Sequence, residues 1–480
     1  MTAAPRLKRR SVRAKAGIVH LGPGAFFRAF NAIYTDDLLR DQGGDWGIVA
    51  VSMQSDRARR ELHAQGGAYT SITLEPQREE RRIIEAITDV MVLPDDPKAV
   101  VAVMANPQIK VVTMTITEKG YCLAPASGAL RLDAPEIQED LATPDMPRTM
   151  PGLVVEALAQ RRAADIEPFT VLSCDNLPSN GETTRQVILD FARARSPDLA
   201  DWIEHRCRFP SSMVDRITPA TTDDVIETLR RAEGYTDFGC VQHEPFRQWV
   251  IEDDFVDGVR PDWSAAGAQF VRSVKEHEAM KLRCLNGTHS TLAYLGYLAG
   301  FETIADTVAH PEFAQLCRRM WQEEILPTIA PPEGEDLAAY VDALLRRYQN
   351  PAIRHRTWQI AMDGSQKLPQ RLLGTIADNL SQGHVPRLLC LAVAGWMRYV
   401  RGQDERGNPI DVRDPMAYEL LRAHAGASAS EEAVAALLAL SDVFPPDLAQ
   451  NTVFRTAVTS AYLELEANGS LATVARAVEN

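Results

Sequence analysis

Short apolar runs alternate with stretches of helical spacing along the first half of the chain. The run at 17–21 (GIVHL) leads directly into Gly22, which is typical of a strand buried in a parallel sheet. Strand–helix alternation of this kind predicts an α/β domain with a doubly wound parallel sheet. Further apolar runs predict strands at 46–53, 111–117 and 169–173, and helical spacing predicts helices at 25–40, 151–163 and 182–194.

The second half of the chain has a different pattern. From about residue 274 the β-branched runs become rare, and long helical patterns are separated by Pro and Gly, as in the segment 331–334. We therefore expect a mainly α-helical second domain, with residues 1–273 in the first domain and 274–480 in the second. The predicted helices of the second domain lie at 276–299, 311–324, 335–347, 384–401 and 431–440.

Length and composition agree with two folded domains. The chain has 480 residues, more than one hydrophobic core usually supports, with 45% hydrophobic and 24% charged residues. The net charge of −14 argues against a nucleic-acid-binding protein. Six basic residues between Arg6 and Lys15 are either a nucleic-acid-binding arm or a solvated, poorly ordered terminus, and we favour the second interpretation.

The apolar runs, the N-terminal segment and the cysteines indicate the cellular location. No run of about 18 apolar residues predicts a membrane span, and the basic N-terminal segment lacks the apolar core of a secretory signal. The seven cysteines are scattered and form no CxxC pair, which indicates reduced thiols and no zinc signature. We expect a cytoplasmic protein without a bound metal and without membrane or nucleic-acid partners.

A glycine-containing segment after the first predicted strand is the first candidate site. Gly22, Pro23 and Gly24 lie between that strand and the next helix, where a tight turn lets the backbone approach a pyrophosphate. The third glycine of the GxGxxG pattern is absent, so an ordinary strand-to-helix turn is the alternative. Arg28 is a candidate phosphate ligand, or else a surface arginine.

The end of the second predicted strand bears on the type of dinucleotide. A carboxylate at this place usually binds the adenosine ribose, and Asp56 is the candidate. Arg57, Arg59 and Arg60 are instead candidates for binding a 2′-phosphate. The pattern leaves NAD and NADP both open, and a solvated start of a helix is the alternative for all four residues.

Polar residues follow the next two predicted strands. Glu118 follows the strand at 111–117, and Asp175 and Asn176 follow the strand at 169–173. Ligands bind beyond the carboxyl ends of such strands. Helix capping or turn formation by Asp175 and Asn176 is the alternative.

The segment 281–289 (KLRCLNGTH) carries the most informative set of side chains. At about 100° per residue, Lys281, Asn286 and His289 lie within one half of a helix surface. A buried lysine can act as a general base, and amide side chains such as Asn176 and Asn286 can polarise a carbonyl. The alternative is a helix with a solvated polar face.

These segments resemble the polyol-specific long-chain dehydrogenases, also called the mannitol dehydrogenase family, over about residues 17–465. The resemblance implies a Rossmann-like first domain, a helical second domain and hydride transfer between NAD(P) and a CH–OH carbon without a metal ion. It is carried by six blocks: IVHLGPGAFFRA (18–29), TITEKGY (115–121), FTVLSCDNLPSNG (169–181), MVDRITP (213–219), EPFRQWVIED (244–253) and KLRCLNGTHS (281–290).

The resemblance also implies roles for single residues. Lys281 is the implied acid–base residue, Asn176 and Asn286 the pair that stabilises an oxyanion, and His289 a residue that orients the substrate. Asp215 belongs to the implied substrate site, and Asp56 and Glu118 remain candidates near the cofactor. The implied dinucleotide segment comprises Ile18, Val19, His20, Leu21, Gly22, Pro23, Gly24, Ala25, Phe26, Phe27, Arg28 and Ala29.

Within the family the C-terminal segments 300–308, 350–371 and 394–416 resemble the fructuronate reductase (mannonate oxidoreductase) subgroup. A sugar acid carries a carboxylate, for which Arg354, Arg356, Lys367 and Arg371 are candidate ligands, with Lys367 and Arg371 preferred because they follow a turn at 363–365. The alternatives are a dehydrogenase of mannitol, arabinitol or sorbitol, and a non-enzymatic dinucleotide-binding regulator. We expect a monomer or a weak homo-oligomer.

Overall fold

The computed structural model describes residues 4–124 and 128–479, and the chain divides into two compact units. Unit 1 comprises residues 1–275 and unit 2 comprises residues 276–480. This division lies two residues after the boundary expected from the hydrophobic pattern. Each unit has its own hydrophobic core, and the two are described separately below.

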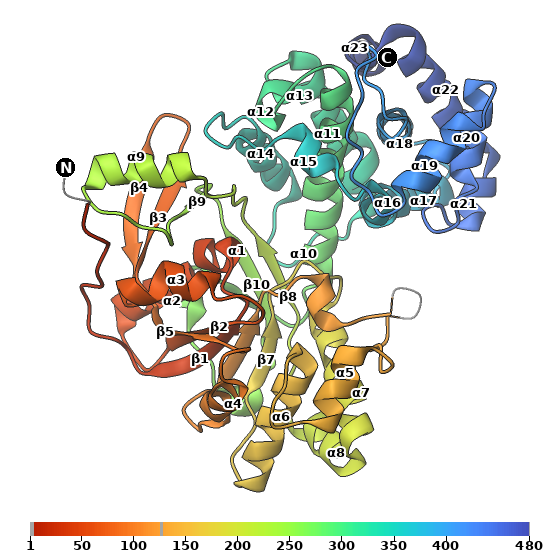
Figure 1. Ribbon diagram of the computed structural model, residues 1–480. Helices are drawn as coiled ribbons and strands as arrows, with labels where there is room; N and C mark the ends of the chain where they lie inside the picture. Colours follow the sequence, from red (N-terminus) through yellow and green to blue (C-terminus); the bar gives the residue numbers. More distant parts are fainter. Residues whose placement is uncertain (1–3, 125–127, 480) are drawn as a thin grey trace. The chain divides into compact units, whose positions relative to one another are not determined.

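The main sheet of unit 1 is parallel and contains five strands in the order β5-β2-β1-β6-β7 (Figure 1). The prediction of a doubly wound sheet is confirmed. The third predicted strand ends at Met114 rather than Thr117, and β5 was not predicted. The strands are β1 (Ala16–Leu21), β2 (Gly47–Ser52), β5 (Ile87–Val92), β6 (Val111–Met114) and β7 (Thr170–Ser173).

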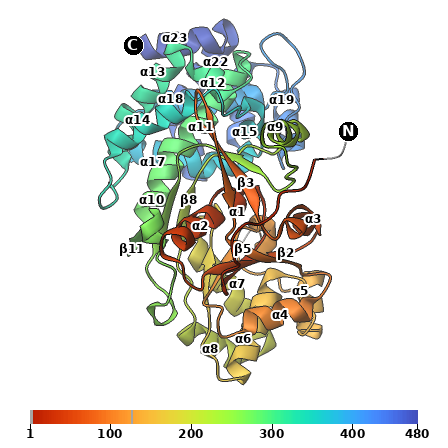
Figure 2. The ribbon, with the colours of Figure 1, turned by 90° about the vertical axis from the view of Figure 1, so that its left-hand side faces the viewer.

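Alternating apolar residues of β1, β2, β6 and β7 belong to different hydrophobic cores. In β1, Val19 and Leu21 belong to one core and Ile18 belongs to the other. Helices α2 (Asn31–Gln42) and α3 (Arg57–Leu62) cover one face of the sheet (Figures 1 and 2). The other face is covered by α4 (Pro97–Ala105), α5 (Pro135–Ala142), α6 (Met150–Ala163), α7 (Asn180–Arg195) and α8 (Pro197–Arg206).

The single helix predicted at 25–40 is wrong, because the chain forms α1 (Ala25–Ala29) and α2 with a break at Phe30. The backbone of Phe30 has φ −133° and ψ −86°, outside the helical region. In this conformation the buried Phe30 ring stacks on Phe26 at 5.1 Å and packs against Trp249 at 5.7 Å between centroids. Aromatic packing therefore overrides the local helical pattern.

Unit 1 also contains two small sheets that the hydrophobic pattern did not predict. Strand β4 has the sequence EERRII and is largely exposed, so it lacks an apolar run. One sheet contains β4 (Glu79–Ile84), β3 (Tyr69–Leu74) and β9 (Val241–His243), and the other contains β11 (Gln269–Val271), β10 (Gln248–Glu252) and β8 (Ser212–Asp215). The remaining elements are η1 (His63–Gln65), η2 (Glu118–Tyr121), α9 (Asp223–Glu233), η3 (Val256–Gly258) and η4 (Trp263–Ala266).

Lys8, Arg10, Arg13 and Lys15 are exposed, as expected of a solvated basic segment, whereas the expectation of poor order is wrong for Arg6 and Arg9. Leu7 is buried, and Arg6 donates to the carbonyl of Glu61 at 2.9 Å. Arg9 donates to the carbonyls of Gly66 at 2.9 Å and Ile87 at 2.7 Å. These guanidinium groups donate to backbone carbonyls near the end of α3, directly after η1 and at the start of β5.

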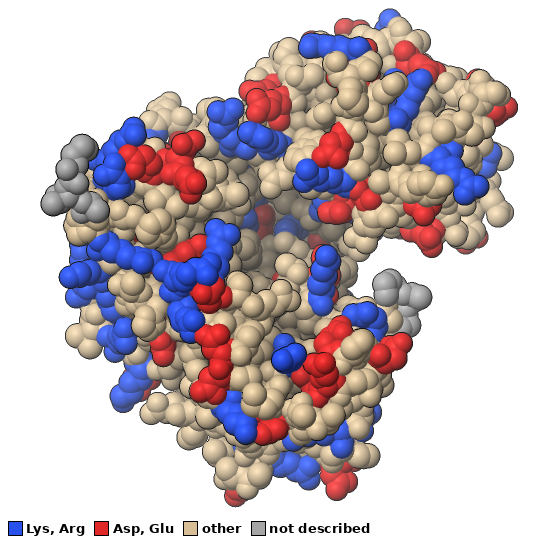
Figure 3. All heavy atoms as spheres, viewed as in Figure 1, with Lys and Arg blue, Asp and Glu red and all other residues tan. Residues whose placement is uncertain are grey.

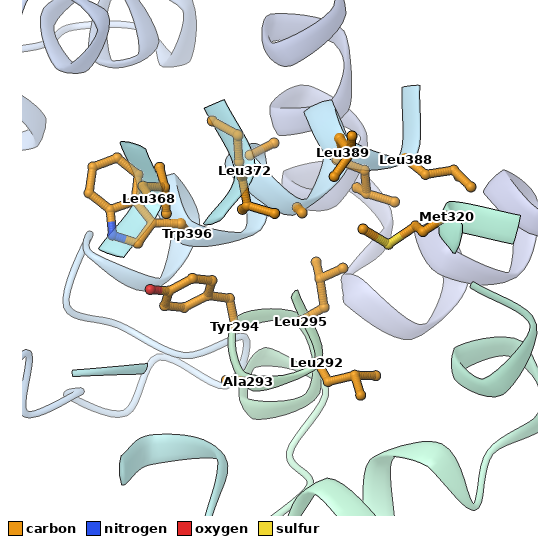
Figure 4. Packing of buried hydrophobic residues seen from close by; sticks show 14 of the residues in the cluster. Leu292, Ala293, Tyr294, Leu295, Met320, Leu368, Leu372, Leu388, Leu389 and Trp396 are labelled. Carbon is orange, nitrogen blue, oxygen red and sulfur yellow. The ribbon is translucent and has the colours of Figure 1, made fainter. Parts of the chain in front are cut away.

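Unit 2 is helical, as predicted. Its core packs α11 (Thr288–Leu298) against α18 (Arg387–Tyr399), and Figure 4 shows Leu292 and Leu295 from α11 with Leu389 and Trp396 from α18. The other elements are α10 (Lys275–Met280), η5 (Lys281–Gly287), α12 (Ile304–Val308), α13 (Pro311–Arg319), η6 (Met320–Ile325), η7 (Leu326–Thr328), α14 (Leu337–Tyr348), α15 (Thr357–Ala361), α16 (Gly364–Leu368), η8 (Pro369–Leu373), α17 (Gly374–Ser381), α19 (Ala417–Ala425), α20 (Ser430–Leu438), α21 (Pro446–Gln450), α22 (Thr452–Asn468) and α23 (Ser470–Glu479).

Positive and negative side chains are interspersed over much of the face shown in Figure 3. Oppositely charged side chains form ion pairs, such as Arg57 with Glu61 and Arg230 with Glu227, at 2.6 Å each. Among the described residues, no helix combines the length and the apolar character needed to cross a bilayer.

Candidate functional site

A cavity of about 840 Å³ in unit 1 lies at the carboxyl ends of the central strands. Its lining includes Gly22 after β1, Ser52 to Ser55 at the end of β2, and Thr115 to Thr117 after β6. The strand order reverses between β1 and β6, and open α/β sheets bind ligands in the crevice at such a point. The size is within the usual range for a small-molecule site.

Gly22 is the residue that brings the backbone close to this cavity. It has φ +88°, and a Cβ atom at this position would lie 2.2 Å from the carbonyl oxygen of Thr115. Only glycine fits both conditions. Gly24 differs, because the nearest atom to its Cβ position would be 3.9 Å away, and it precedes the first residue of α1. The backbone N–H groups of the first helical turn begin at this wall of the cavity.

The segment 18–29, predicted to bind a dinucleotide, divides into two groups. Gly22, Pro23, Gly24, Ala25 and Arg28 line the cavity. The other seven residues are not part of its lining, and six of them are buried in the unit: Ile18, Val19, His20, Leu21, Phe27 and Ala29, with Phe26 partly buried.

His20 supports the strand ends beside the cavity. Its Nδ1 lies 2.8 Å from Thr113 Oγ1, its Nε2 lies 3.1 Å from Thr115 Oγ1, and its ring stacks on Phe27 at 3.6 Å. Complete burial lowers the pKa of His20 to about 3, so the imidazole is neutral at pH 7. A neutral, fully bonded ring at this position fixes the loop after β6 relative to Gly22.

Arg28 is buried rather than on the surface, which excludes the surface alternative. Its Nη1 lies 2.9 Å from Glu61 Oε2, and Arg57 Nε lies 2.6 Å from Glu61 Oε1. All three side chains line the cavity. The wall near α3 therefore carries two guanidinium groups that share one carboxylate.

Asp56 and Glu118 are placed next to the cavity but are not part of its lining. Asp56 precedes α3 without making a capping hydrogen bond from its side chain, and its carboxylate pairs with Arg60. Glu118 begins the short helix η2 and is exposed, between Thr117 and Lys119, which both line the cavity.

Asp175 has a clear structural role that differs from helix capping. Its carboxylate accepts hydrogen bonds from the backbone N–H of Ile116 at 3.1 Å and Thr117 at 2.9 Å, and from the Tyr121 hydroxyl at 2.9 Å. The capping alternative is therefore wrong for Asp175, which ties the end of β7 to the loop after β6. Asn176 follows it, four residues before α7 begins at Asn180.

A second cavity of about 770 Å³ in unit 1 shares Met53, Gln54 and Arg148 with the first. Pro94, Pro97 and Met146 add apolar surface to its lining. A flat apolar ring system fits a lining of this kind.

The catalytic candidates of unit 2 lie on a π-helical turn, η5 (Lys281–Gly287). The assumption of a regular α-helix through 276–299 is wrong at this turn. In an α-helix, Lys281 and Asn286 would differ in direction by about 140°. In a π-turn the backbone hydrogen bonds connect residues i and i+5, which brings these two side chains closer to one face. Lys281 is 8% exposed and Asn286 is partly buried.

His289 lies one turn further on, in α11, within a group of cationic and aromatic side chains of unit 2. Its ring stacks on Tyr348 at 5.4 Å and meets His355 edge-on at 4.8 Å. Burial lowers the pKa of His289 well below its ordinary value, and the neighbouring His355, Arg371, Arg347 and Lys367 lower it further. His355 and Arg347 were not predicted, because no local pattern connects them with residue 289.

The four cationic side chains that were proposed to bind a carboxylate differ in burial and in their contacts. Arg371 is desolvated, which lowers its pKa, and it donates to Ser290 Oγ at 3.0 Å. Lys367 is partly buried and donates to the carbonyl of Met362. Arg354 and Arg356 are exposed and lie near Glu302, at 3.9 and 3.6 Å, as ordinary surface charges do.

Asp215, the other predicted substrate residue, is the last residue of β8 in unit 1. It is buried and lies opposite Gln248 of β10.

Two observations concern metals and thiols. All seven cysteines lie among the described residues, are buried and are unbridged. In the ranges 4–124 and 128–479, no three His, Cys, Asp or Glu side chains gather as metal ligands.

Comparisons with known proteins identify the family. The model of the mannitol dehydrogenase Rossmann domain matches residues 16–265, and that of the mannitol dehydrogenase C-terminal domain matches residues 273–466. The chain is 48% identical to a D-mannonate oxidoreductase from Escherichia coli K12, over 96% of each chain. It is 40% identical to a mannitol 2-dehydrogenase from Phaeosphaeria nodorum, over 98% of this chain and 83% of that protein.

A solved structure agrees in fold as well. The mannitol 2-dehydrogenase of Pseudomonas fluorescens, in a ternary complex with NAD and D-mannitol, superimposes with a TM-score of 0.87 at 36% identity, over 100% of this chain and 98% of that chain. The chain therefore belongs to the mannitol dehydrogenase family and is an oxidoreductase that acts on a CH–OH group.

Proposed function

We propose that the chain interconverts a keto-sugar acid and its aldonate, D-fructuronate and D-mannonate, with NAD(H) and without a metal ion. The observation that carries the substrate class is the cationic group in unit 2. Arg347, Lys367 and Arg371 all act on the buried His289, and Arg371 is itself desolvated. The planar donors of the Arg371 guanidinium match a carboxylate, and its desolvation would strengthen a charge-assisted contact with one. The identity with a D-mannonate oxidoreductase supports the same class.

The residues of unit 1 fit a dinucleotide. The close approach of the backbone at Gly22 and the open space at Gly24 suit a pyrophosphate, and the second cavity, with Pro94, Pro97 and Met146, suits an adenine ring. When bound, the nicotinamide supplies or accepts the hydride of the reaction.

We propose NAD rather than NADP because the arginines of α3 already have carboxylate partners. Arg57 pairs with Glu61, Arg59 with Asp95 and Arg60 with Asp56. A 2′-phosphate would have to compete with these carboxylates for each guanidinium group. The neighbouring structure of mannitol 2-dehydrogenase contains NAD.

In the proposed step, Lys281 gives a proton to the carbonyl oxygen during reduction and removes it during oxidation. Lys281 is 8% exposed, and lysine is a residue type that can serve as a general acid and base. We propose that the amide of Asn286 donates a hydrogen bond to that oxygen as negative charge develops there, and that Asn176 is a second oxyanion-stabilising residue. His289, neutral because of its lowered pKa, is proposed to orient a substrate hydroxyl.

We also propose a cytoplasmic location. The buried, unbridged cysteines support it.

A polyol 2-dehydrogenase is the second candidate function. It is favoured by the 40% identity with a mannitol 2-dehydrogenase and by the fold neighbour that was solved with D-mannitol. A polyol carries no charge, so it would make no charge-assisted contact with the desolvated guanidinium of Arg371.

The test compares D-mannonate and D-mannitol as hydride donors, by the absorbance of NADH. We expect kcat/KM to be about 30- to 150-fold higher for mannonate, since a buried charge-assisted contact contributes about 2–3 kcal/mol. Arg371→Ala should remove most of this preference. Arg346→Ala, which changes the exposed neighbour of Arg347 on α14, is the matched control and should keep it.

Two results would contradict the proposal. A wild-type protein that oxidises mannitol faster than mannonate would support the polyol alternative. A mannonate preference that is unchanged in Arg371→Ala would show that this arginine does not bind the carboxylate.

A further inference from the structure

Backbone carbonyls of the π-turn η5 are bonded by side chains from distant elements of unit 2. The carbonyl of Cys284 accepts hydrogen bonds from Trp321 Nε1 at 2.9 Å and from Thr288 Oγ1 at 2.6 Å. The carbonyl of Leu285 accepts one from the Tyr348 hydroxyl at 2.8 Å. Trp321 belongs to η6 and Tyr348 ends α14, so two separate elements fix the same two peptide groups.

These contacts are buried. Trp321 and Tyr348 are 1% and 2% exposed, and Thr288 and Cys284 are fully buried. A hydrogen bond to a peptide carbonyl in such a place is difficult to replace, because water is excluded. The side chains of Trp321 and Tyr348 therefore help to determine the backbone conformation of η5.

The same two aromatic rings are linked to His289. Trp321 stacks on Tyr348 with centroids 6.3 Å apart at 25°, and Tyr348 stacks on His289 at 5.4 Å and 18°. The Tyr348 hydroxyl also lies 2.9 Å from Thr288 Oγ1. One connected group thus holds both the turn that carries Lys281 and the imidazole that follows it.

A π-turn needs such support, since π-helical backbone is rare and usually limited to one turn. If residues 281–287 relaxed to α-helical geometry, Asn286 would rotate away from Lys281 by a large angle, up to about 140° in a regular helix. A misplacement of about 1 Å in a catalytic group can lower the rate about 100-fold.

We propose that Trp321 and Tyr348 are positioning residues for the reaction. By donating to the carbonyls of Cys284 and Leu285, they keep η5 in the wide form in which Lys281 and Asn286 point toward one face. This inference rests on the proposed role of Lys281. It does not depend on whether the substrate is a sugar acid or a polyol.

The experiment removes each donor and keeps the ring. Trp321→Phe and Tyr348→Phe should each lower kcat at least about tenfold, with little change in the KM for the dinucleotide, which binds in unit 1. The pH at which kcat falls to half its plateau should also shift, because the surroundings of the Lys281 ammonium group change. A purely structural role would not move that profile.

Two matched controls are available in the same unit. Trp396 and Tyr399 of α18 are buried, and among the described residues Trp396 Nε1 and the Tyr399 hydroxyl have no hydrogen-bond partner. Trp396, labelled in Figure 4, packs in the core. Trp396→Phe and Tyr399→Phe should therefore leave kcat and its pH profile within about twofold of wild type.

Several outcomes overturn the inference. If the Trp321 and Tyr348 variants match their controls in kcat and pH profile while Lys281→Ala is inactive, the positioning role is wrong and the role of Lys281 stands. If Lys281→Ala is active, the proposed function fails first. Should one phenylalanine variant not fold, the other decides. Loss of folding in both contradicts a role confined to positioning.

Discussion

The crevice of unit 1, which we propose binds the dinucleotide, and the lysine-bearing turn of unit 2 are built in different ways. The crevice depends on backbone: Gly22 turns with positive φ against the carbonyl of Thr115, and the walls are the ends of adjacent strands. The turn depends on side chains, because Trp321 and Tyr348, 37 and 63 residues away from their acceptors, hold η5. A backbone site is visible as a short glycine pattern, whereas a site held by distant side chains is not.

Gly22→Ala should give the largest effect on the unit 1 side of this comparison. The added Cβ would lie 2.2 Å from a carbonyl oxygen at a φ of +88°. We expect the free energy of unfolding to fall by about 3 kcal/mol and dinucleotide binding to weaken at least about tenfold. Chemical denaturation and a fluorescence titration with NADH measure the two effects.

Gly24→Ala is the matched control for that change. Its φ is −71°, and the closest atom to the new Cβ would be 3.9 Å away. Equal losses of stability in the two variants would show that the close approach of Gly22 to the carbonyl of Thr115 does not require glycine. A Gly22→Ala protein with normal stability and normal dinucleotide affinity would contradict the account of the crevice.

A smaller effect is expected from the buried imidazoles of unit 2. Burial, with a contribution from Lys367, lowers the pKa of His355 from 6.5 to about 4. Below pH 6.5 the unfolded chain takes up a proton that the folded chain refuses until about pH 4, so stability is lost as the pH falls through this window. His355→Asn should reduce the stability lost between pH 7.5 and 5.0 by about 2 kcal/mol.

Urea denaturation at the two pH values measures this difference. The matched control is His384→Asn, which changes an exposed histidine of the same unit. If His355→Asn and His384→Asn lose stability equally between the two pH values, the pKa of His355 is not lowered in the folded protein.

The sequence predicted the regular parts of the fold because their patterns are local. Four strands of the main sheet are confirmed, and helices are present in all five segments predicted for unit 2, although π-helical turns interrupt the segment 276–299 and end the segment 311–324. Phe30 breaks a predicted helix because its ring packs on Trp249, more than 200 residues away. Strand β4 was missed because its charged sequence has no apolar run, and Arg6 and Arg9 are held by backbone carbonyls more than 50 residues further along the chain.

The same limit applies to the candidate sites. Gly22 and Gly24 were predicted from their position after the first strand. The π-turn was not, because hydrogen bonds from Trp321 and Tyr348 stabilise it and leave no local pattern. Spacing could not separate Arg371, which is desolvated, from Arg354 and Arg356, which lie near Glu302 at the surface.

Chemical rescue of Lys281→Ala is the most direct test of the proposed acid–base role. Turnover should fall at least about 1000-fold, within the usual range for loss of a general base, while NADH binds with wild-type affinity. Added methylamine should then restore turnover in proportion to its free-base concentration, and Lys275→Ala, at an exposed lysine, should behave as wild type. Near-normal turnover of Lys281→Ala without any amine would contradict the account.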